Sequence, residues 1–220
     1  MSDKLVLYVG EKNISSWSMR GFLAVVEKEV PFEERTISLR EDKDRSRRRS
    51  VSPTGRVPAL HHGDRVIPDS MAILEYLEET FPAPKYKALW PADAGERAYA
   101  RWLGAAMHSG FTKLRESMSF NLCFLKTVPK ATPEAIAEAK EMLSFWETAL
   151  NAKTAAGPFL FGSFCGADIM YAPAVVRLTA FQVDTTPTPK GAAYMKAVLA
   201  HPSVRRWMEP ARALPPAETY

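Results

Sequence analysis

Two hydrophobic periodicities alternate along the first 81 residues of the chain. A continuous apolar, β-rich run predicts a buried strand at residues 4–10, and alternating apolar and polar positions predict a second strand at 31–37. Two short strands are predicted at 57–62 and 65–67, separated by the turn signal Gly63-Asp64. Recurrence every three or four positions predicts helices at residues 16–29 and 70–81, and the polar segment 41–50 is predicted as a short helix. The resulting order, βαβαββα, is typical of a small α/β domain.

The pattern changes after residue 82. Pro82, Pro84 and Pro91 interrupt the helical periodicity, because proline lacks a backbone donor and restricts the residue before it. From there the apolar spacing is helical throughout. A long helical stretch is predicted at residues 94–125, either continuous or kinked near Gly110, followed by helices at 133–153, 168–181, 191–199 and 203–210. We therefore expect an α/β domain at residues 1–82, a linker at 83–92 and an all-α domain at 93–220.

Local capping signals support two of these helices. Thr132 precedes Pro133, so it is a plausible N-cap with proline at the first helical position. Cys165 stands three residues before Asp168, where a capping box has a hydroxyl residue and an acid. Because a cysteine is a weak cap, we expect the box to be half intact and Cys165→Ser to raise the melting temperature.

Composition narrows the class of protein. The 220 residues are 46% hydrophobic, which is ample for buried cores. No apolar run approaches the roughly 18 residues of a membrane span, and the apolar stretch at residues 5–9 is too short for a signal-peptide core. With only two cysteines, Cys123 and Cys165, the chain does not resemble a disulfide-stapled secreted domain. We predict a cytoplasmic protein that does not bind a membrane.

Charge and histidine spacing argue against two further kinds of partner. The net charge is +4, and four arginines fall within residues 45–49. Three acidic residues within 41–44 offset them, so a solvated helix face is the favoured interpretation and no nucleic acid is expected. His61 and His62 are adjacent and point to opposite faces of a strand, and no Cys/His cluster has metal-ligand spacing, so no metal is expected.

The most specific pattern lies in three neighbouring segments. The run SPTGRVPAL at residues 52–60 is followed by IPDS at residues 67–70 and then by the apolar helix. This combination resembles the glutathione-site signature of the cytosolic glutathione S-transferase family. The resemblance implies a thioredoxin-like N-terminal domain that binds glutathione, followed by an all-α domain that holds a second, electrophilic substrate. It extends over the whole chain and is most specific at residues 4–81.

The resemblance assigns a role to each matching residue. Pro58 corresponds to a cis proline, which makes Val57 present its backbone N–H and C=O to the cysteinyl part of glutathione as an added strand would. Asp69 suits the ammonium of the γ-glutamyl end. The Ser70 hydroxyl and the helix N-terminus suit its carboxylate. Arg56 occupies a position where the family often has a polar or basic contact.

The candidate catalytic residues lie at residues 13–20, NISSWSMR. This run resembles the Ser-Ser-Cys motif of the zeta class, with Trp17, which we assign to the glutathione-binding set, in place of the cysteine. A serine hydroxyl bonded to sulfur at a helix N-terminus favours the thiolate. The zeta match selects Ser15, whereas counting back from Arg20, as in theta and delta patterns, selects Ser16. We favour Ser15 and expect the other serine to cap the helix.

Two other chemistries are disfavoured at this position. Omega- and beta-class relatives have a cysteine here and perform thiol–disulfide chemistry, which Trp17 cannot. Some classes use a strand tyrosine, but Tyr8 lies inside its predicted strand and is more typical of a core residue.

In this family the second substrate binds between the domains, against the long linking helix. Candidates on one face of that helix are Trp102, Met107, His108, Phe111, Thr112 and Arg115.

The leading hypothesis is an enzyme that activates glutathione, as co-substrate, and conjugates it to a small electrophile. One alternative is a glutathione-dependent cis-trans isomerase of the maleylacetoacetate type, suggested by the two serines and weakened by Trp17. The other is a non-catalytic binding module on the same fold. The resemblance also implies a homodimer. The sequence does not identify the electrophile.

Overall fold

A computed structural model describes residues 4–40 and 44–217, so residues 41–43 of the predicted short helix lie outside it. The contacts divide the chain into two compact units. Unit 1 comprises Met1–Leu89 and Arg206–Tyr220, and unit 2 comprises Trp90–Arg205.

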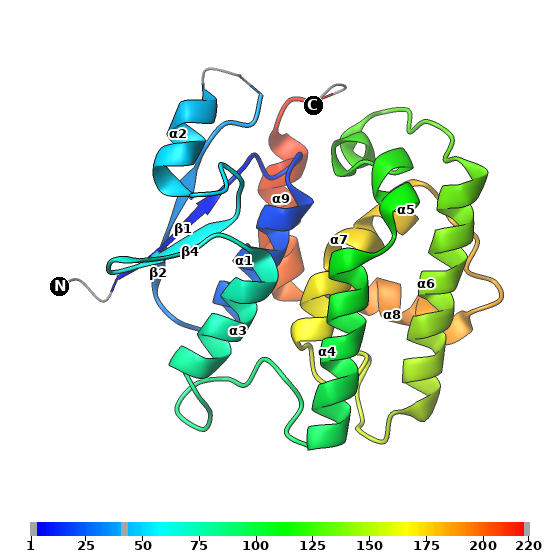
Figure 1. Cartoon of the computed structure of the whole chain (residues 1–220). Helices are drawn as coiled ribbons and strands as arrows, with labels where there is room; N and C mark the ends of the chain where they lie inside the picture. The colour runs from blue at the N-terminus through cyan, green and yellow to red at the C-terminus, as the bar shows by residue number, and fades with distance from the viewer. Residues whose placement is uncertain (1–3, 41–43, 218–220) are drawn as a thin grey trace. The chain divides into compact units, whose positions relative to one another are not determined.

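Unit 1 contains a four-stranded mixed sheet with helices on both sides (Figure 1). Its elements are β1 (Leu5–Val9), α1 (Ser16–Glu27), β2 (Phe32–Thr36), α2 (Asp44–Val51), β3 (Ala59–His62), β4 (Arg65–Ile67) and α3 (Ser70–Thr80). The strand order is β2-β1-β3-β4; β1 runs parallel to β2, whereas β3 runs antiparallel to both β1 and β4. The predicted βαβαββα order is confirmed.

The two faces of this sheet have different surroundings, and the burial along β1 alternates accordingly. Leu5, Leu7 and Val9 are buried on the side of α1 and α3, which pack against each other. On the other face the Tyr8 ring lies 4.7 Å from the His61 ring. His61 Nε2 bonds to the carbonyl of Val51, the last residue of α2, at 2.7 Å. Both sides of the sheet are therefore covered.

The last helix, α9 (Pro202–Ala213), brings its C-terminal half into unit 1. Trp207 is fully buried and its ring lies 5.1 Å from that of Phe22 in α1. Its indole N–H donates to the carbonyl oxygen of Lys12 at 3.0 Å. A residue near the C-terminus thus contacts the turn between β1 and α1.

Unit 2 is helical and is organised around α7. Its elements are α4 (Ala94–Ser109), α5 (Thr112–Ser117), the 3-10 helix η1 (Phe120–Phe124), α6 (Pro133–Ala152), α7 (Gly166–Ala180) and α8 (Pro189–Ala200). Helix α7 is buried along nearly all its length. The Trp146 ring lies 5.3 Å from Tyr171 of α7 and 5.1 Å from Tyr194 of α8. An α/β domain followed by helices matches the predicted fold class.

The helical stretch predicted over residues 94–125 is not continuous, and its first break falls at Gly110, where a kink is the predicted alternative. Helix α4 ends at Gly110, whose N–H donates to the Ala106 carbonyl at 2.8 Å, and Phe111 has a left-handed backbone with φ 55°. Helix α5 then restarts with its Leu114 N–H bonded to a Glu138 carboxylate oxygen of α6 at 2.8 Å. A side chain distant in sequence thus replaces the missing intrahelical acceptor, which periodicity alone does not reveal.

The two predicted caps are present in the expected form. Thr132 accepts a hydrogen bond from the N–H of Ala135 and so caps α6. At α7, the Asp168 carboxylate accepts from the N–H of Cys165 at 2.8 Å and from that of Leu160 at 3.2 Å. Both halves of the capping box are present, because the Cys165 side chain also faces the N–H of Asp168; the sulfur is the weak member of the pair, as expected. Within the described ranges, none of the helices has the length and apolar character needed to span a membrane.

Candidate active site

The serine pair lies where β1 leads into α1. Helix α1 begins at Ser16, and Ser15 is its N-cap, with an extended backbone (φ −92°, ψ 94°). The Ser15 hydroxyl oxygen accepts from the N–H of Ser18 at 3.1 Å, and the hydroxyl donates to Ser18 Oγ at 2.8 Å. Ser18 Oγ also accepts from the N–H of Gly10 at 3.0 Å. A buried chain of hydrogen bonds therefore connects Gly10, directly after β1, to Ser18 and through it to Ser15.

The expectation that the non-catalytic serine would cap the helix needs correction. We expected Ser16 to be the cap if Ser15 acts on sulfur, but Ser15 is the cap. A cap uses a lone pair of the hydroxyl oxygen, whereas a thiolate is stabilised by the hydroxyl hydrogen. One serine can therefore perform both tasks, and the capping role does not argue against Ser15 as the donor to sulfur.

Three predicted segments of the site converge around Gly21 of α1. A Cβ atom built on Gly21 would lie 2.9 Å from Pro58 and 3.6 Å from Ile73 of α3, so a side chain here would separate α1 from the other two segments. The Val57–Pro58 peptide bond is cis. Among the residues placed by the structure, none forms a hydrogen bond with the main chain of Val57. Its N–H and C=O groups are therefore not engaged by the described residues, and their role in binding glutathione stays a prediction.

The acidic–serine pair forms the start of α3. Asp69 is the N-cap, and its Oδ1 accepts from the N–H groups of Met71 at 2.8 Å and Ala72 at 3.0 Å. The Ser70 side chain is 1% exposed, and its hydroxyl has no hydrogen-bond partner within residues 4–40 and 44–217. A buried hydroxyl without a partner is costly, so Ser70 fits a site that a polar ligand completes.

Electrostatics favour anions at both helix starts. The first turns of α1 and α3 contain no acidic side chain, so the partial positive charge of each N-terminus is countered only by the Asp69 cap at α3. A thiolate at α1 and a carboxylate at α3 are the kinds of group that such N-termini bind.

Trp17, Arg56 and Tyr8 have different surroundings. Trp17 is half-buried, and the Arg20 guanidinium carbon lies 4.3 Å from the centroid of its ring. Arg56 is exposed, and its N–H donates to Thr54 Oγ1 at 3.2 Å. Tyr8 lies on the α2 side of the sheet, where its hydroxyl accepts from Arg35 at 3.1 Å. Tyr8 is therefore engaged elsewhere.

The candidates for the second substrate all lie in unit 2. Met107 and Phe111 are buried, Trp102 and Thr112 are exposed, and His108 is half-buried. Arg115 donates to the His108 carbonyl at 3.5 Å, and burial lowers the pKa of its guanidinium. Their assignment to a substrate stays a prediction.

The cysteines are poor candidates for redox chemistry. Both lie in unit 2 and neither is in a disulfide. Burial raises the pKa of the Cys123 thiol to about 11 and that of Cys165 well above its ordinary value. Because the thiolate is the reactive form, both sulfurs are held in the unreactive state at neutral pH.

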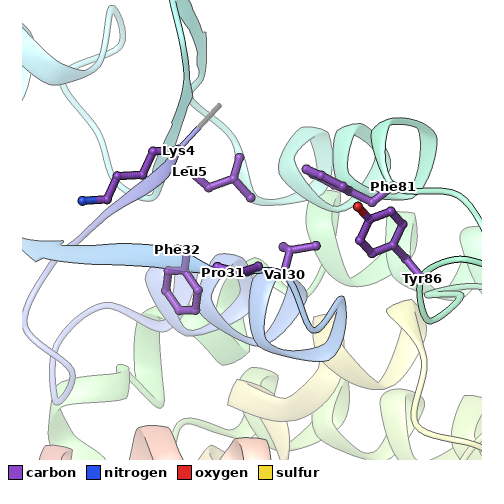
Figure 2. A pocket seen from close by; sticks show the side chains of 7 residues that line it. All are labelled: Lys4, Leu5, Val30, Pro31, Phe32, Phe81 and Tyr86. Carbon is purple, nitrogen blue, oxygen red and sulfur yellow. The ribbon is translucent and has the colours of Figure 1, made fainter. Parts of the chain in front are cut away.

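A separate hollow of about 330 Å³ lies at the opposite end of β1 from the serines. It is lined by Lys4, Leu5, Val30, Pro31, Phe32, Phe81 and Tyr86 (Figure 2). None of the predicted site residues contributes to it. The described part of the chain also has no group of three or more His, Cys, Asp or Glu side chains placed to hold a metal ion.

Ser18 is a further residue of the site that the sequence motifs did not indicate. It follows Ser15 by three positions, the spacing at which an N-cap hydroxyl meets a backbone N–H, so a signal was present. Its second bond, to Gly10, depends on how β1 and α1 pack.

Comparison with known proteins gives matches over both units. The model of the glutathione S-transferase N-terminal domain matches residues 14–80, and that of the glutathione S-transferase C-terminal domain matches residues 129–209. The chain is 32% identical to maleylacetoacetate isomerase of Rattus norvegicus, over 90% of this chain and 89% of that protein. It is 30% identical to a probable maleylacetoacetate isomerase of Caenorhabditis elegans, over 86% and 85% of the two chains.

Solved structures agree. A glutathione transferase homologue from Burkholderia, solved with bound glutathione, has a TM-score of 0.70 and 30% identity, covering 97% of this chain and all of that one. Maleyl pyruvate isomerase, described as a bacterial glutathione S-transferase of the zeta class, has a TM-score of 0.71 and 27% identity, covering 92% and 95%.

Proposed function

The chain belongs to the glutathione S-transferase family, and from that premise we propose that it binds glutathione in unit 1, ionises the thiol and adds the sulfur to an electrophilic carbon. The observation that carries this proposal is the Ser15 hydroxyl, held at the N-terminus of α1 by Ser18. The family match supports glutathione as the substrate. The identity of the electrophile lies outside the proposal.

Binding is assigned to groups around the starts of β3 and α3. The Val57 N–H and C=O would pair with the cysteinyl part of glutathione, as in strand addition. The Asp69 carboxylate would accept from the γ-glutamyl ammonium. The Ser70 hydroxyl, which has no partner among the described residues, would donate to the γ-glutamyl carboxylate. These contacts would hold the thiol near α1. Most of the affinity for glutathione would therefore come from groups other than Ser15, which ionises the thiol.

Ionisation is assigned to Ser15. Rotation about its Cβ–Oγ bond would redirect the hydroxyl hydrogen from Ser18 Oγ to sulfur, while Oγ still accepts from the Ser18 N–H. The Ser18 hydroxyl could then donate to Ser15, and it would keep the hydrogen bond from Gly10. Each donor in such a chain strengthens the next, so the hydrogen offered to the thiolate is more acidic than that of an isolated serine.

The size of the effect can be bounded. An ordinary cysteine thiol has a pKa near roughly 8.5, so only about 3% is thiolate at pH 7. Lowering that pKa by about two units takes roughly 2.7 kcal/mol and makes about three quarters of the thiol ionised. One charge-assisted hydrogen bond and a helix N-terminus together contribute on this order. Holding the two reactants together adds to the rate.

A second candidate function is glutathione-dependent cis-trans isomerisation. The relatives named above as maleylacetoacetate isomerases favour it, and it shares the first step. The thiolate adds to one carbon of a conjugated double bond, the resulting single bond rotates, and elimination restores the double bond and releases glutathione. Trp17, in place of the zeta-class cysteine, is the departure that weakens this candidate.

Product analysis separates these functions. The protein is incubated with glutathione and either an aryl halide activated by nitro groups or a cis-ene-dicarbonyl acid. A glutathione conjugate of the aryl halide, lost in Ser15→Ala, supports transferase activity. A trans product with glutathione fully recovered supports isomerisation. Measurable binding of glutathione without turnover of either compound would leave only a binding module.

The proposal includes the setting of the reaction. We place it in the cytoplasm, where thiols are kept reduced, consistent with two unpaired cysteines. We also propose a homodimer, as is usual in the family.

A further inference from the structure

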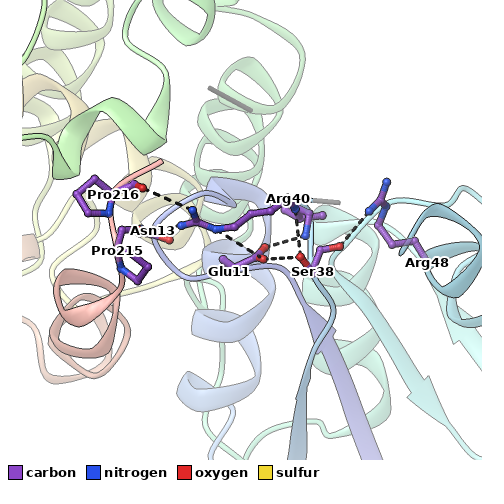
Figure 3. A network of polar contacts seen from close by, with 8 residues as sticks. Glu11, Asn13, Ser38, Arg40, Arg48, Pro215 and Pro216 are labelled. Atoms are coloured by element: carbon purple, nitrogen blue, oxygen red, sulfur yellow. Dashed lines mark hydrogen bonds and ion pairs between the residues drawn. The ribbon is translucent and has the colours of Figure 1, made fainter. Parts of the chain in front are cut away.

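The C-terminal segment lies against the turn that presents the serine pair (Figure 3). Asn13 Nδ2 donates to the carbonyl oxygen of Pro215 at 2.9 Å, and Arg40 Nη2 donates to the same oxygen at 2.8 Å. Arg40 Nη1 reaches the Pro216 carbonyl at 3.5 Å. One carbonyl near the end of the chain is thus held by two side chains from different loops of unit 1.

The turn itself is tied to the first of the two serines. The N–H groups of Ile14 and Ser15 donate to the Glu11 carbonyl at 3.0 and 2.9 Å. The Glu11 carboxylate in turn accepts from Ser38 Oγ and from the N–H of Leu39, each at 2.8 Å. The position of the Ser15 backbone is therefore set by how residues 11–14 are held.

Three contacts hold this turn from the C-terminal side. Asn13 is fully buried and bonded to Pro215. The Lys12 carbonyl accepts from the buried Trp207 indole, and the Lys12 ammonium lies 4.4 Å from the centroid of the Trp207 ring. All of these residues belong to unit 1. Contacts from about two hundred positions away are thus concentrated on the two residues that precede Ile14 and Ser15.

We propose that Asn13 and Arg40 are positioning residues, which hold the Pro215 carbonyl and thereby orient the Ser15 hydroxyl toward the glutathione sulfur. This inference rests on the proposed function, in which Ser15 acts on that sulfur. Neither side chain has to touch glutathione: Asn13 acts through the turn. Arg40 acts through Pro215 and also through the Glu11 carboxylate, whose Oε1 lies 4.0 Å from Arg40 Nε (Figure 3). The binding groups at Val57, Asp69 and Ser70 lie on other segments and are unaffected.

The geometry explains why this hold matters. A misplacement of about 1 Å in a catalytic group can lower a rate by about a hundredfold. Ser15 Oγ already has two bonds to Ser18, at 2.8 and 3.1 Å, which fix its distance from α1. The direction from which it approaches a ligand depends on the turn, because Ser15 lies outside the helix as its cap.

The test compares two shortened chains. A chain that ends at Leu214 lacks the Pro215 and Pro216 carbonyls, and a matched control that ends at Ala217 keeps them. For each chain, glutathione affinity, the pKa of the bound thiol from its ultraviolet thiolate absorbance, and the unfolding midpoint are measured. We expect the affinity of the Leu214 chain for glutathione to lie within about threefold of that of wild type. We expect the pKa of its bound thiol to be higher by about one unit, which lowers the ratio of thiolate to thiol by roughly tenfold.

Arg40 provides the second arm in the full-length chain. Arg40→Ala is expected to raise the bound thiol pKa in the same direction, and Arg40→Lys, which keeps one donor, to restore part of it. In the chain that ends at Leu214, Arg40→Ala is expected to have a smaller effect than in the full-length chain, because the contact with Pro215 is already lost and only the ion pair with Glu11 remains.

The outcomes separate this inference from the function on which it rests. A wild-type chain that binds glutathione without lowering its thiol pKa overturns the proposed function, and the positioning role with it. Suppose instead that wild type lowers the pKa of the bound thiol, and that the chain ending at Leu214 and the Arg40→Ala variant lower it by the same amount. That result overturns the positioning role alone. An Arg40→Ala effect that persists undiminished in the Leu214 chain also overturns it, since Arg40 would then act through another group.

Discussion

Replacing Asp69 with asparagine separates the helix-capping role of this side chain from the charge that we propose it offers to glutathione. Asp69 Oδ1 accepts from two N–H groups in the first turn of α3, at 2.8 and 3.0 Å. The amide oxygen of asparagine can accept both bonds. The variant differs from wild type chiefly in the loss of one negative charge beside the proposed ammonium site.

The two effects differ in size. Asparagine and aspartate are about equal as N-caps, whereas alanine costs about 1 kcal/mol, or roughly 2–4 °C in melting temperature for a chain of this size. A hydrogen bond to a charged group contributes about 1.5–3 kcal/mol and a neutral one about 1 kcal/mol. Asp69→Asn should therefore unfold within about 1 °C of wild type and bind glutathione about tenfold more weakly. Asp69→Ala should lose both stability and affinity.

The assay is calorimetric titration of each variant with glutathione and with glutathione acetylated on its amino group. Wild type should prefer free glutathione by about tenfold, and Asp69→Asn should discriminate much less between the two ligands. Thermal unfolding without ligand provides the stability arm. Equal affinity of wild type and Asp69→Asn for free glutathione would refute the assignment of this carboxylate to the ammonium.

Three further predictions concern stability and assembly. Cys165→Ser should raise the melting temperature by about 2–4 °C by supplying the missing capping hydroxyl, and an unchanged or lower value would contradict this alignment of the capping box. Burial raises the pKa of Asp168 from 3.8 to about 6, so protonation of Asp168 favours the folded state. Its contribution of about 3 kcal/mol to the free energy of unfolding should be fully present below pH 4 and be lost as pH rises through 6. A urea series in which Asp168→Asn shows the same pH slope would exclude this cause. A hydrodynamic mass near twice 24.5 kDa is expected for a homodimer, and 24.5 kDa would rule it out.

The elements that the sequence predicted well are those determined by local patterning. The apolar, β-rich run at residues 4–10 predicts a buried strand, and β1 is found there with Leu5, Leu7 and Val9 buried. Thr132 before Pro133 predicts the start of α6 at the observed residue. Such signals reside within a few residues of one another, so they can be read without knowing the tertiary structure.

The errors and omissions have the opposite origin. Helix α4 has Gly110 as its C-cap, and the first turn of α5 is capped by the Glu138 side chain of α6. No local sequence pattern contains this cap. The Pro215 carbonyl meets Asn13 and Arg40 from about two hundred positions away. The capping role of Ser15 is compatible with donation to sulfur for a local reason. The cap uses the hydroxyl oxygen as an acceptor, whereas donation to sulfur uses the hydroxyl hydrogen.

The central claim is that Ser15 ionises the glutathione thiol. The most direct test is titration of wild type, Ser15→Ala and Ser16→Ala with glutathione while following thiolate absorbance across a pH series. The account predicts that all three bind glutathione, that wild type and Ser16→Ala lower the thiol pKa by about two units, and that Ser15→Ala loses most of this shift. A shift that survives in Ser15→Ala, or one that disappears only in Ser16→Ala, would contradict it.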